Sequence, residues 1–146
     1  MIKIMRTTGS ASEFTDTDGI YVFRLYIVPK NVEVEKLDKT YGDLLIKESD
    51  ESHLAIVAKV FDEGKIDKES LRTGLVALMR HFKTLDEAIS PKMLVVSRHE
   101  FKSLKEESMF EIMIKGIAGL LLSDDEVDKF SVVITEYQKD EASVFE

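Results

Sequence analysis

The chain has 146 residues, with 28 Asp and Glu against 20 Lys and Arg, a net charge of −8 and no cysteine. This size is typical of one domain that buries a core without disulfides, and the lack of cysteine excludes thiolate nucleophiles and Cys-based metal centres. The negative charge disfavours non-specific nucleic-acid binding, which needs clustered Lys and Arg, and suits a basic partner or an ordinary cytoplasmic protein.

The first third of the chain predicts strands. Residues 2–5 form a short strand candidate, and the polar segment 7–18 is typical of a flexible loop. Residues 20–28 (IYVFRLYIV) give the strongest strand pattern, and they are apolar on both faces apart from Arg24. A strand of this kind is expected in the middle of a sheet. A weaker strand is expected at 43–47.

Helical spacing then replaces the alternation. Leu54, Val57, Ala58 and Phe61 fit a helix that ends near Gly64, although the segment also alternates in part, as a strand would. A longer helix is predicted over residues 68–86, with Asp67 as its N-cap. Its buried stripe consists of Leu71, Leu75, Leu78, Phe82 and Leu85.

The last third predicts a strand at 93–96, a helical region from residue 98, a final strand at 130–137 and a frayed tail at 138–146. Residues 109–122 are apolar almost all round, which predicts a buried helix. Such a helix is covered either by its own domain or by a second chain, as in a dimer interface.

These elements predict a single α+β domain over residues 1–146, with a mixed sheet of about four to five strands packed against three to four helices. The N-terminus lacks the apolar core of a secretory signal, and no apolar run reaches the ~20 residues that span a bilayer. A cytoplasmic protein without a membrane partner is expected.

The segment Ser97-Arg98-His99-Glu100 is the sharpest chemical candidate. As a ligand site at a strand end, it would use His99 as a general base and Arg98 to hold an anion. The S-x-x-E spacing is also that of a capping box, in which Ser97 accepts from the backbone N–H of Glu100 and Glu100 reaches back to Ser97. Capping is the favoured interpretation, and the two roles are compatible.

Two charged surfaces are candidates for partner binding. The first is the acidic segment Asp124, Asp125, Glu126 and Asp128, which opens with a second S-x-x-E box at Ser123. The second is a basic strip on the 68–86 helix, formed by Arg72, Arg80 and Lys83. Each surface could instead be an ordinary solvated face.

Other motifs carry little chemistry. The scattered His53, His81 and His99 lack metal-ligand spacing, and the turn at residues 16–19 fails as a calcium loop, so no metal or cofactor is predicted. Gly116 and Gly119 favour close packing of another element over a phosphate-binding loop. Motifs for nucleotide binding, serine hydrolysis and zinc proteolysis are missing from the sequence.

The leading functional hypothesis is therefore a non-enzymatic protein that binds another macromolecule through an acidic surface, as an inhibitor, an immunity-type protein or an accessory subunit. One alternative is a small enzyme or ligand-binding domain with its site at Ser97 to Glu100. Another is a homo-oligomeric structural or assembly protein of viral type, which would contact its neighbours through strand 20–28 and the 7–18 loop. A protein partner is expected in the first case, and copies of the chain in the last.

Overall fold

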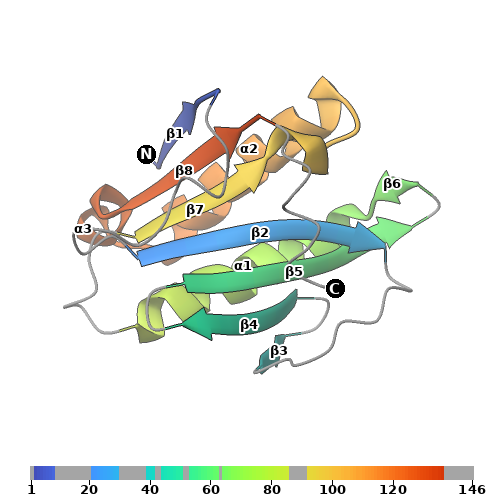
Figure 1. The fold of residues 1–146 in the computed structure, drawn as a ribbon. Coiled ribbons are helices and arrows are strands. Elements are labelled where there is room, and N and C mark those ends of the chain that lie inside the picture. The colour runs from blue at the N-terminus through green and yellow to red at the C-terminus, as the bar shows by residue number, and fades with distance from the viewer. Residues whose placement is uncertain are drawn as a thin grey trace.

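The computed structural model describes residues 2–8, 21–29, 39–41, 44–50, 53–62, 64–85 and 92–136. They form a mixed β-sheet with its helices packed behind it (Figure 1). The strands are β1 (Lys3–Arg6), β2 (Tyr21–Pro29), β3 (Lys39–Tyr41), β4 (Leu44–Asp50), β5 (His53–Asp62), β6 (Lys65–Ile66), β7 (Lys92–Ser97) and β8 (Phe130–Thr135). The helices are α1 (Lys68–Thr84), α2 (Leu104–Leu121) and α3 (Asp124–Asp128), and a 3₁₀ turn spans Arg98–Glu100.

The sheet has the order β1-β8-β7-β2-β5-β4-β3, and β6 pairs with β5. The neighbours from β1 to β5 run parallel, whereas β4, β3 and β6 are antiparallel to the strands they join. The mixture of helices and strands agrees with the expected class, although the parallel centre is also a feature of α/β proteins. With eight strands, the sheet is larger than the four to five expected.

Chain connectivity explains why α1 and α2 lie on one face of the sheet. Helix α1 connects β5 to β7, and α2 connects β7 to the neighbouring β8, so both crossovers step in the same direction across the sheet. Parallel crossovers are almost always right-handed, and two such steps in one direction place both helices on the same side. The N-termini of α1 and α2 consequently lie at the same end of the sheet, where the parallel strands end.

Strand β2 occupies the centre of the sheet, between β7 and β5, as its two apolar faces predict. Phe23, Leu25 and Ile27 face the helices, whereas Val22 belongs to a separate buried cluster with Val95 and Val133. Both backbone edges of β2 are paired within the sheet, with β5 on one side and β7 on the other.

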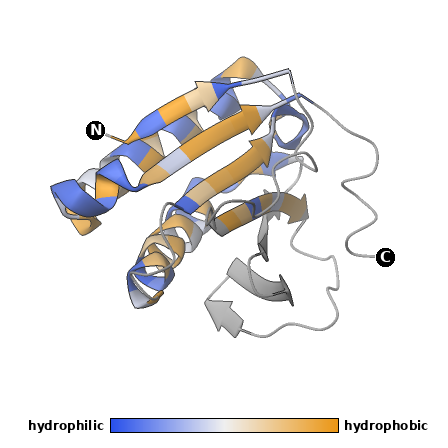
Figure 2. Cartoon of the chain, turned by 60° about the vertical axis from the view of Figure 1, so that its left-hand side comes forward, coloured by the Kyte–Doolittle hydropathy of each residue, from blue (hydrophilic) through white to orange (hydrophobic). Residues whose placement is uncertain are grey.

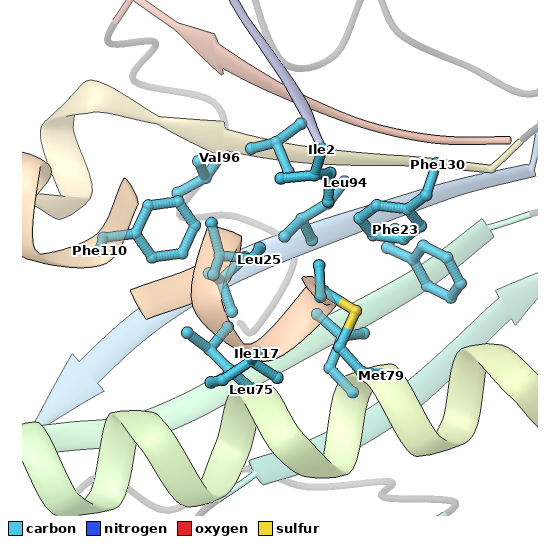
Figure 3. Close-up of a cluster of buried hydrophobic side chains, with 14 of the residues drawn as sticks. Ile2, Phe23, Leu25, Leu75, Met79, Leu94, Val96, Phe110, Ile117 and Phe130 are labelled. Atoms are coloured by element: carbon cyan, nitrogen blue, oxygen red, sulfur yellow. The ribbon is translucent and has the colours of Figure 1, made fainter. Parts of the chain in front are cut away.

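The main core fills the layer between the sheet and the two helices. Figure 3 shows side chains from β2 and β7 meeting those of both helices, among them Phe23, Leu94, Met79 and Ile117. Phe130 lies against Phe82 of α1 with ring centroids 4.9 Å apart at 90°, an edge-to-face contact. In Figure 2, hydrophobic residues are concentrated on the central strands, whereas hydrophobic and hydrophilic residues alternate along the helices.

Helix α1 forms as its sequence predicts. Asp67 caps it, because its carboxylate accepts hydrogen bonds from the backbone N–H groups of Glu69 at 3.0 Å and Ser70 at 3.3 Å. Four residues of the predicted stripe are buried, namely Leu71, Leu75, Leu78 and Phe82, whereas Leu85 is the C-cap and is only partly buried. The helix ends at Thr84, two residues before the predicted end.

The helix expected near residues 54–61 is wrong. That segment is strand β5, which pairs with β2 on one side and β4 on the other. Two hydrogen-bonded neighbours outweigh a helical periodicity that the partial alternation already contested. Gly64 does not cap a helix but has φ +78° in the turn between β5 and β6, a conformation that suits glycine.

Two further elements were not expected, and three predictions fall wholly or mostly outside the described residues. Strands β3 and β6 have only three and two residues, too few to show a periodicity. Of the predicted 7–18 loop only residues 7 and 8 are described, and the turn at 16–19 and the tail at 138–146 lie outside the described residues.

Candidate functional site

The Ser97–Glu100 segment caps a turn, but not by the predicted pairing. Ser97 Oγ accepts a hydrogen bond from the backbone N–H of His99 at 3.2 Å. The Glu100 carboxylate instead accepts from the N–H of Ile27 in β2 at 2.5 Å, which ties the turn to the sheet. The N-cap of α2 is Ser103, whose Oγ accepts from the Glu106 N–H at 3.2 Å. The predicted capping box is therefore wrong, because a neighbouring strand competes for the carboxylate.

Arg98 lies in an ion-pair cluster at the carboxyl ends of β1, β7 and β8. Glu107 of α2 is held between two arginines, 3.1 Å from Arg6 and 3.3 Å from Arg98, and its side chain is only 4% exposed. Arg6 also pairs with Glu111, and Arg98 lies 3.9 Å from Glu136. This cluster, which we call the Glu107 brace, fastens α2 to the strand ends.

A small crevice of about 160 Å³ adjoins the brace. Arg6 and Arg98 line it together with Thr135, whose Oγ1 is buried without a hydrogen-bond partner. His99 is exposed and is not among the described lining residues of this crevice. Because three carboxylates already balance the two arginines, the crevice offers little net attraction for an anion.

The acidic segment forms α3 and its cap. Ser123 and Glu126 make the predicted capping box, with hydrogen bonds of 3.2 and 2.9 Å. The backbone N–H of Ser123, and Lys83 more weakly, lower the pKa of Glu126. Asp125 pairs with Lys129 at 3.3 Å.

The remaining carboxylates of this segment, Asp124 and Asp128, are exposed. They make no ion pair with any described residue. Half of the predicted acidic surface is thus engaged within the chain.

The three residues of the predicted basic strip differ in their contacts. Lys83 bridges to the C-terminal end of α2, where it donates to the carbonyl of Leu121 at 3.1 Å and lies 3.9 Å from Glu126. Arg72 pairs with Glu69 at 3.4 Å near the other end of α1, and Arg80 is exposed between them. The roles of these residues in partner binding stay a prediction.

Helix α2 is less buried than the apolar sequence of residues 109–122 predicts. One face is buried through Phe110, Ile114 and Ile117, but Ile112 and Leu120 are 73% and 86% exposed. The expected close packing of Gly116 and Gly119 is wrong as well, because a Cβ added at either glycine would meet nothing within 4 Å. The helix is therefore apolar all round without being buried all round.

The exposed apolar face of α2 borders a groove of about 730 Å³ against α1. We call it the α1–α2 groove. Its apolar lining comes mainly from α2 and includes two methionines, whose flexible side chains adapt to different surfaces. The lining residues are Lys68, Arg72, Val76, Lys105, Ser108, Met109, Ile112, Met113, Gly116, Ile117 and Leu120.

A second hollow of about 410 Å³ adjoins the groove where α1 and α2 begin. The two spaces share the lining residues Lys68, Lys105 and Met109. The second hollow is also lined by Lys65 and Lys102, which are not lining residues of the groove. Sequence reasoning missed this cluster, since its lysines come from two segments far apart in the chain. The sequence did contain one signal for this site, namely the segment 109–122, which is apolar almost all round.

In the described part of the chain, no cluster of three or more His, Asp or Glu side chains is arranged to hold a metal ion. None of the helices described is both long and apolar enough to cross a membrane.

Neither a protein-family model nor a curated protein sequence matches the chain.

Proposed function

We propose that this chain binds a protein partner, and that the α1–α2 groove is the contact surface. The observation that carries the proposal is the exposure of Ile112 and Leu120, at 73% and 86%, beside a groove of about 730 Å³. Single exposed apolar residues are ordinary on protein surfaces, but a continuous apolar surface that borders a groove is typical of an interaction site.

Binding of another macromolecule is also the function expected from the sequence, but the proposed contact surface is the α1–α2 groove in place of the acidic segment. The acidic segment is partly neutralised by Lys83 and Lys129 and is used to cap α3. The α1–α2 groove, in contrast, offers apolar area that gains free energy when water is removed from it, about 25 cal/mol per Å². Binding energy is concentrated in buried apolar and aromatic contacts more than in exposed charges.

The ligand-site alternative at Ser97 to Glu100 has weaker support. The Glu100 carboxylate already accepts a hydrogen bond from the backbone of β2, and His99 is not among the described residues that line the crevice beside Arg98. The assembly alternative would place a second copy of the chain in the groove, and the experiment below separates that outcome from binding of a different protein.

The test places a photo-crosslinking amino acid at Ile112 or Leu120 in the full chain, expressed in its native source. We expect crosslinks to a protein at both positions and none above background at Lys115, which is exposed on α2 but does not line the groove. We also expect Ile112→Glu to reduce capture of that protein about tenfold or more, because a charge then enters an apolar contact.

Lys115→Glu is the matched control and should leave capture unchanged. Crosslinks only between copies of the chain would replace the proposal with self-assembly, which light scattering would confirm. Equal crosslinking at positions 112, 120 and 115, or none at any of them, would overturn it.

A further inference from the structure

We infer that the α1–α2 groove receives a single amphipathic helix of the partner, with acidic residues at the end that lies over the N-termini of α1 and α2. This inference rests on the proposed function and specifies the chemistry of the partner. Shape and charge of the groove carry it independently.

The shape of the groove fits a helix. Its lining follows α2 from Lys105 to Leu120, a distance of about 22 Å at 1.5 Å per residue. One row along α2 alternates small and large residues four apart, namely Ser108, Ile112, Gly116 and Leu120. Rows at this spacing form the ridges that interlock with a second helix, and the small residues leave hollows between the large ones.

The open space at Gly116 strengthens this point. A glycine in the middle of a helix is less favourable than alanine, and no neighbour among the described residues requires the missing side chain here. The hollow lies between Ile112 and Leu120, where it can receive a side chain from a helix laid along α2.

The charge of the groove fixes the orientation of that helix. Its cationic lining residues Lys68, Arg72 and Lys105 lie toward the N-terminal ends of α1 and α2, and none of the lining residues that the structure describes is Asp or Glu. In the part of the chain that the structure describes, Lys65, Lys68 and Lys105 form no ion pair. Among the described residues that line the adjoining hollow, the one carboxylate is that of Glu106, which accepts hydrogen bonds from the backbone N–H groups of Lys102 and Ile66 at 2.7 and 3.3 Å.

Other occupants fit less well. Two copies of the chain packed through this face would add a second set of the same cations, and like charges oppose each other. A small amphiphile usually occupies a site that encloses most of its surface, whereas Ile112 and Leu120 remain largely exposed at the border of the groove.

The experiment measures binding of two synthetic helical peptides to the full chain by fluorescence anisotropy. Both have about 18 residues and a leucine stripe at i, i+3, i+4 and i+7 spacing. One carries glutamates in its terminal turns at one end, and the other carries lysines there. We expect the acidic peptide to bind at least about tenfold more tightly, with a difference that shrinks in about 0.3 M salt.

Variants then locate the contact. Lys68→Glu combined with Lys105→Glu should invert the preference between the two peptides, Ile112→Glu should weaken both, and Lys115→Glu should change neither. Equal binding of the two peptides, absence of binding, or a preference that survives the double reversal would overturn the inference. Binding of oleate or of vesicles with 25% phosphatidylserine in place of either peptide would overturn it in favour of a lipid.

The crosslinking experiment distinguishes failure of this inference from failure of the proposed function. A protein that crosslinks at Ile112 and Leu120 through a segment that is not an acidic amphipathic helix would overturn this inference and keep the proposed function. Lack of any specific crosslink to another protein would overturn the proposed function itself.

Discussion

At the scale of single residues, the glycines show that one residue type has different structural roles in different parts of the fold. Gly64 has φ +78° in a tight turn, where a side chain would be strained. Gly116 and Gly119 lie in helix α2 with open space beside them. The first glycine is required by the backbone, whereas the other two weaken their helix without a packing reason inside the chain.

We expect Gly119→Ala to raise the free energy of unfolding by about 0.5–1 kcal/mol, because alanine stabilises a helix interior relative to glycine. Gly64→Ala should lower it by about 1–2 kcal/mol, because of its left-handed backbone. Urea denaturation followed by circular dichroism measures both changes. A stabilising Gly64→Ala or a destabilising Gly119→Ala would contradict this account.

Glu126 gives a prediction for the pH dependence of stability. Its pKa in the folded chain lies below the ordinary value of 4.5, chiefly because the Ser123 N–H donates to its carboxylate. A carboxyl with a lowered folded pKa stabilises the fold above its unfolded pKa, and this contribution is lost as the pH falls through the folded pKa. Glu126→Gln should therefore be less stable than the wild type at pH 7.

The difference between these two proteins should shrink below pH 4.5 and vanish at still lower pH. Denaturation curves of both proteins at several pH values provide the measurement. Asp124→Asn, which removes an exposed carboxylate of the same helix, is the control and should show no comparable trend. A difference independent of pH would exclude the proposed role of the carboxylate.

At the scale of elements, the Glu107 brace connects pieces that are distant in sequence. It joins β1 through Arg6, the turn after β7 through Arg98, and helix α2 through Glu107 itself. A buried carboxylate held by two arginines costs little while all partners are present, but removal of one partner leaves charges without compensation. The brace thereby fixes the end of α2 from which the α1–α2 groove begins.

We expect Glu107→Ala to lower the free energy of unfolding by about 2 kcal/mol, less than for a fully buried pair because both arginines are nearly half exposed. Arg72→Ala, which removes an exposed pair with Glu69, should cost less than about 0.5 kcal/mol. Chemical denaturation compares the two. A cost for Glu107→Ala no greater than for Arg72→Ala would show that the brace does not stabilise the fold.

At the scale of the whole molecule, one apolar layer connects the sheet to both helices. The main core combines residues of β2, β7, β8, α1 and α2, and Phe130 contacts rings from both sides of that layer, Phe23 at 6.2 Å and Phe82 at 4.9 Å between centroids. A core shared among these elements favours a single cooperative unit, as the domain prediction from the sequence requires.

We therefore expect one thermal transition, with calorimetric and van't Hoff enthalpies that agree. Phe130→Ala should lower the free energy of unfolding by about 3–5 kcal/mol, since it leaves a cavity between the sheet and α1. Differential scanning calorimetry tests both statements. Two separate transitions, or a variant in which only one part of the chain unfolds earlier, would contradict a single domain.

Elements with local signals could be predicted from the amino-acid sequence alone. The two-faced pattern of residues 20–28 predicts the central strand, Asp67 predicts the start of α1, and the S-x-x-E spacing at Ser123 predicts the cap of α3. In each case the physical cause lies within a few residues, as alternation along a strand or as a side chain that satisfies the nearest backbone N–H groups.

The other features depend on contacts between segments that are distant in the chain. Residues 54–61 became a strand because β2 and β4 flank them, and Glu100 left its predicted cap because β2 offers a backbone donor. Whether apolar residues 109–122 are covered also depends on partners distant in the chain, and α1 leaves one side of that helix open. Burial, register and a site assembled from two helix N-termini are properties of long-range contacts, which a local pattern does not specify.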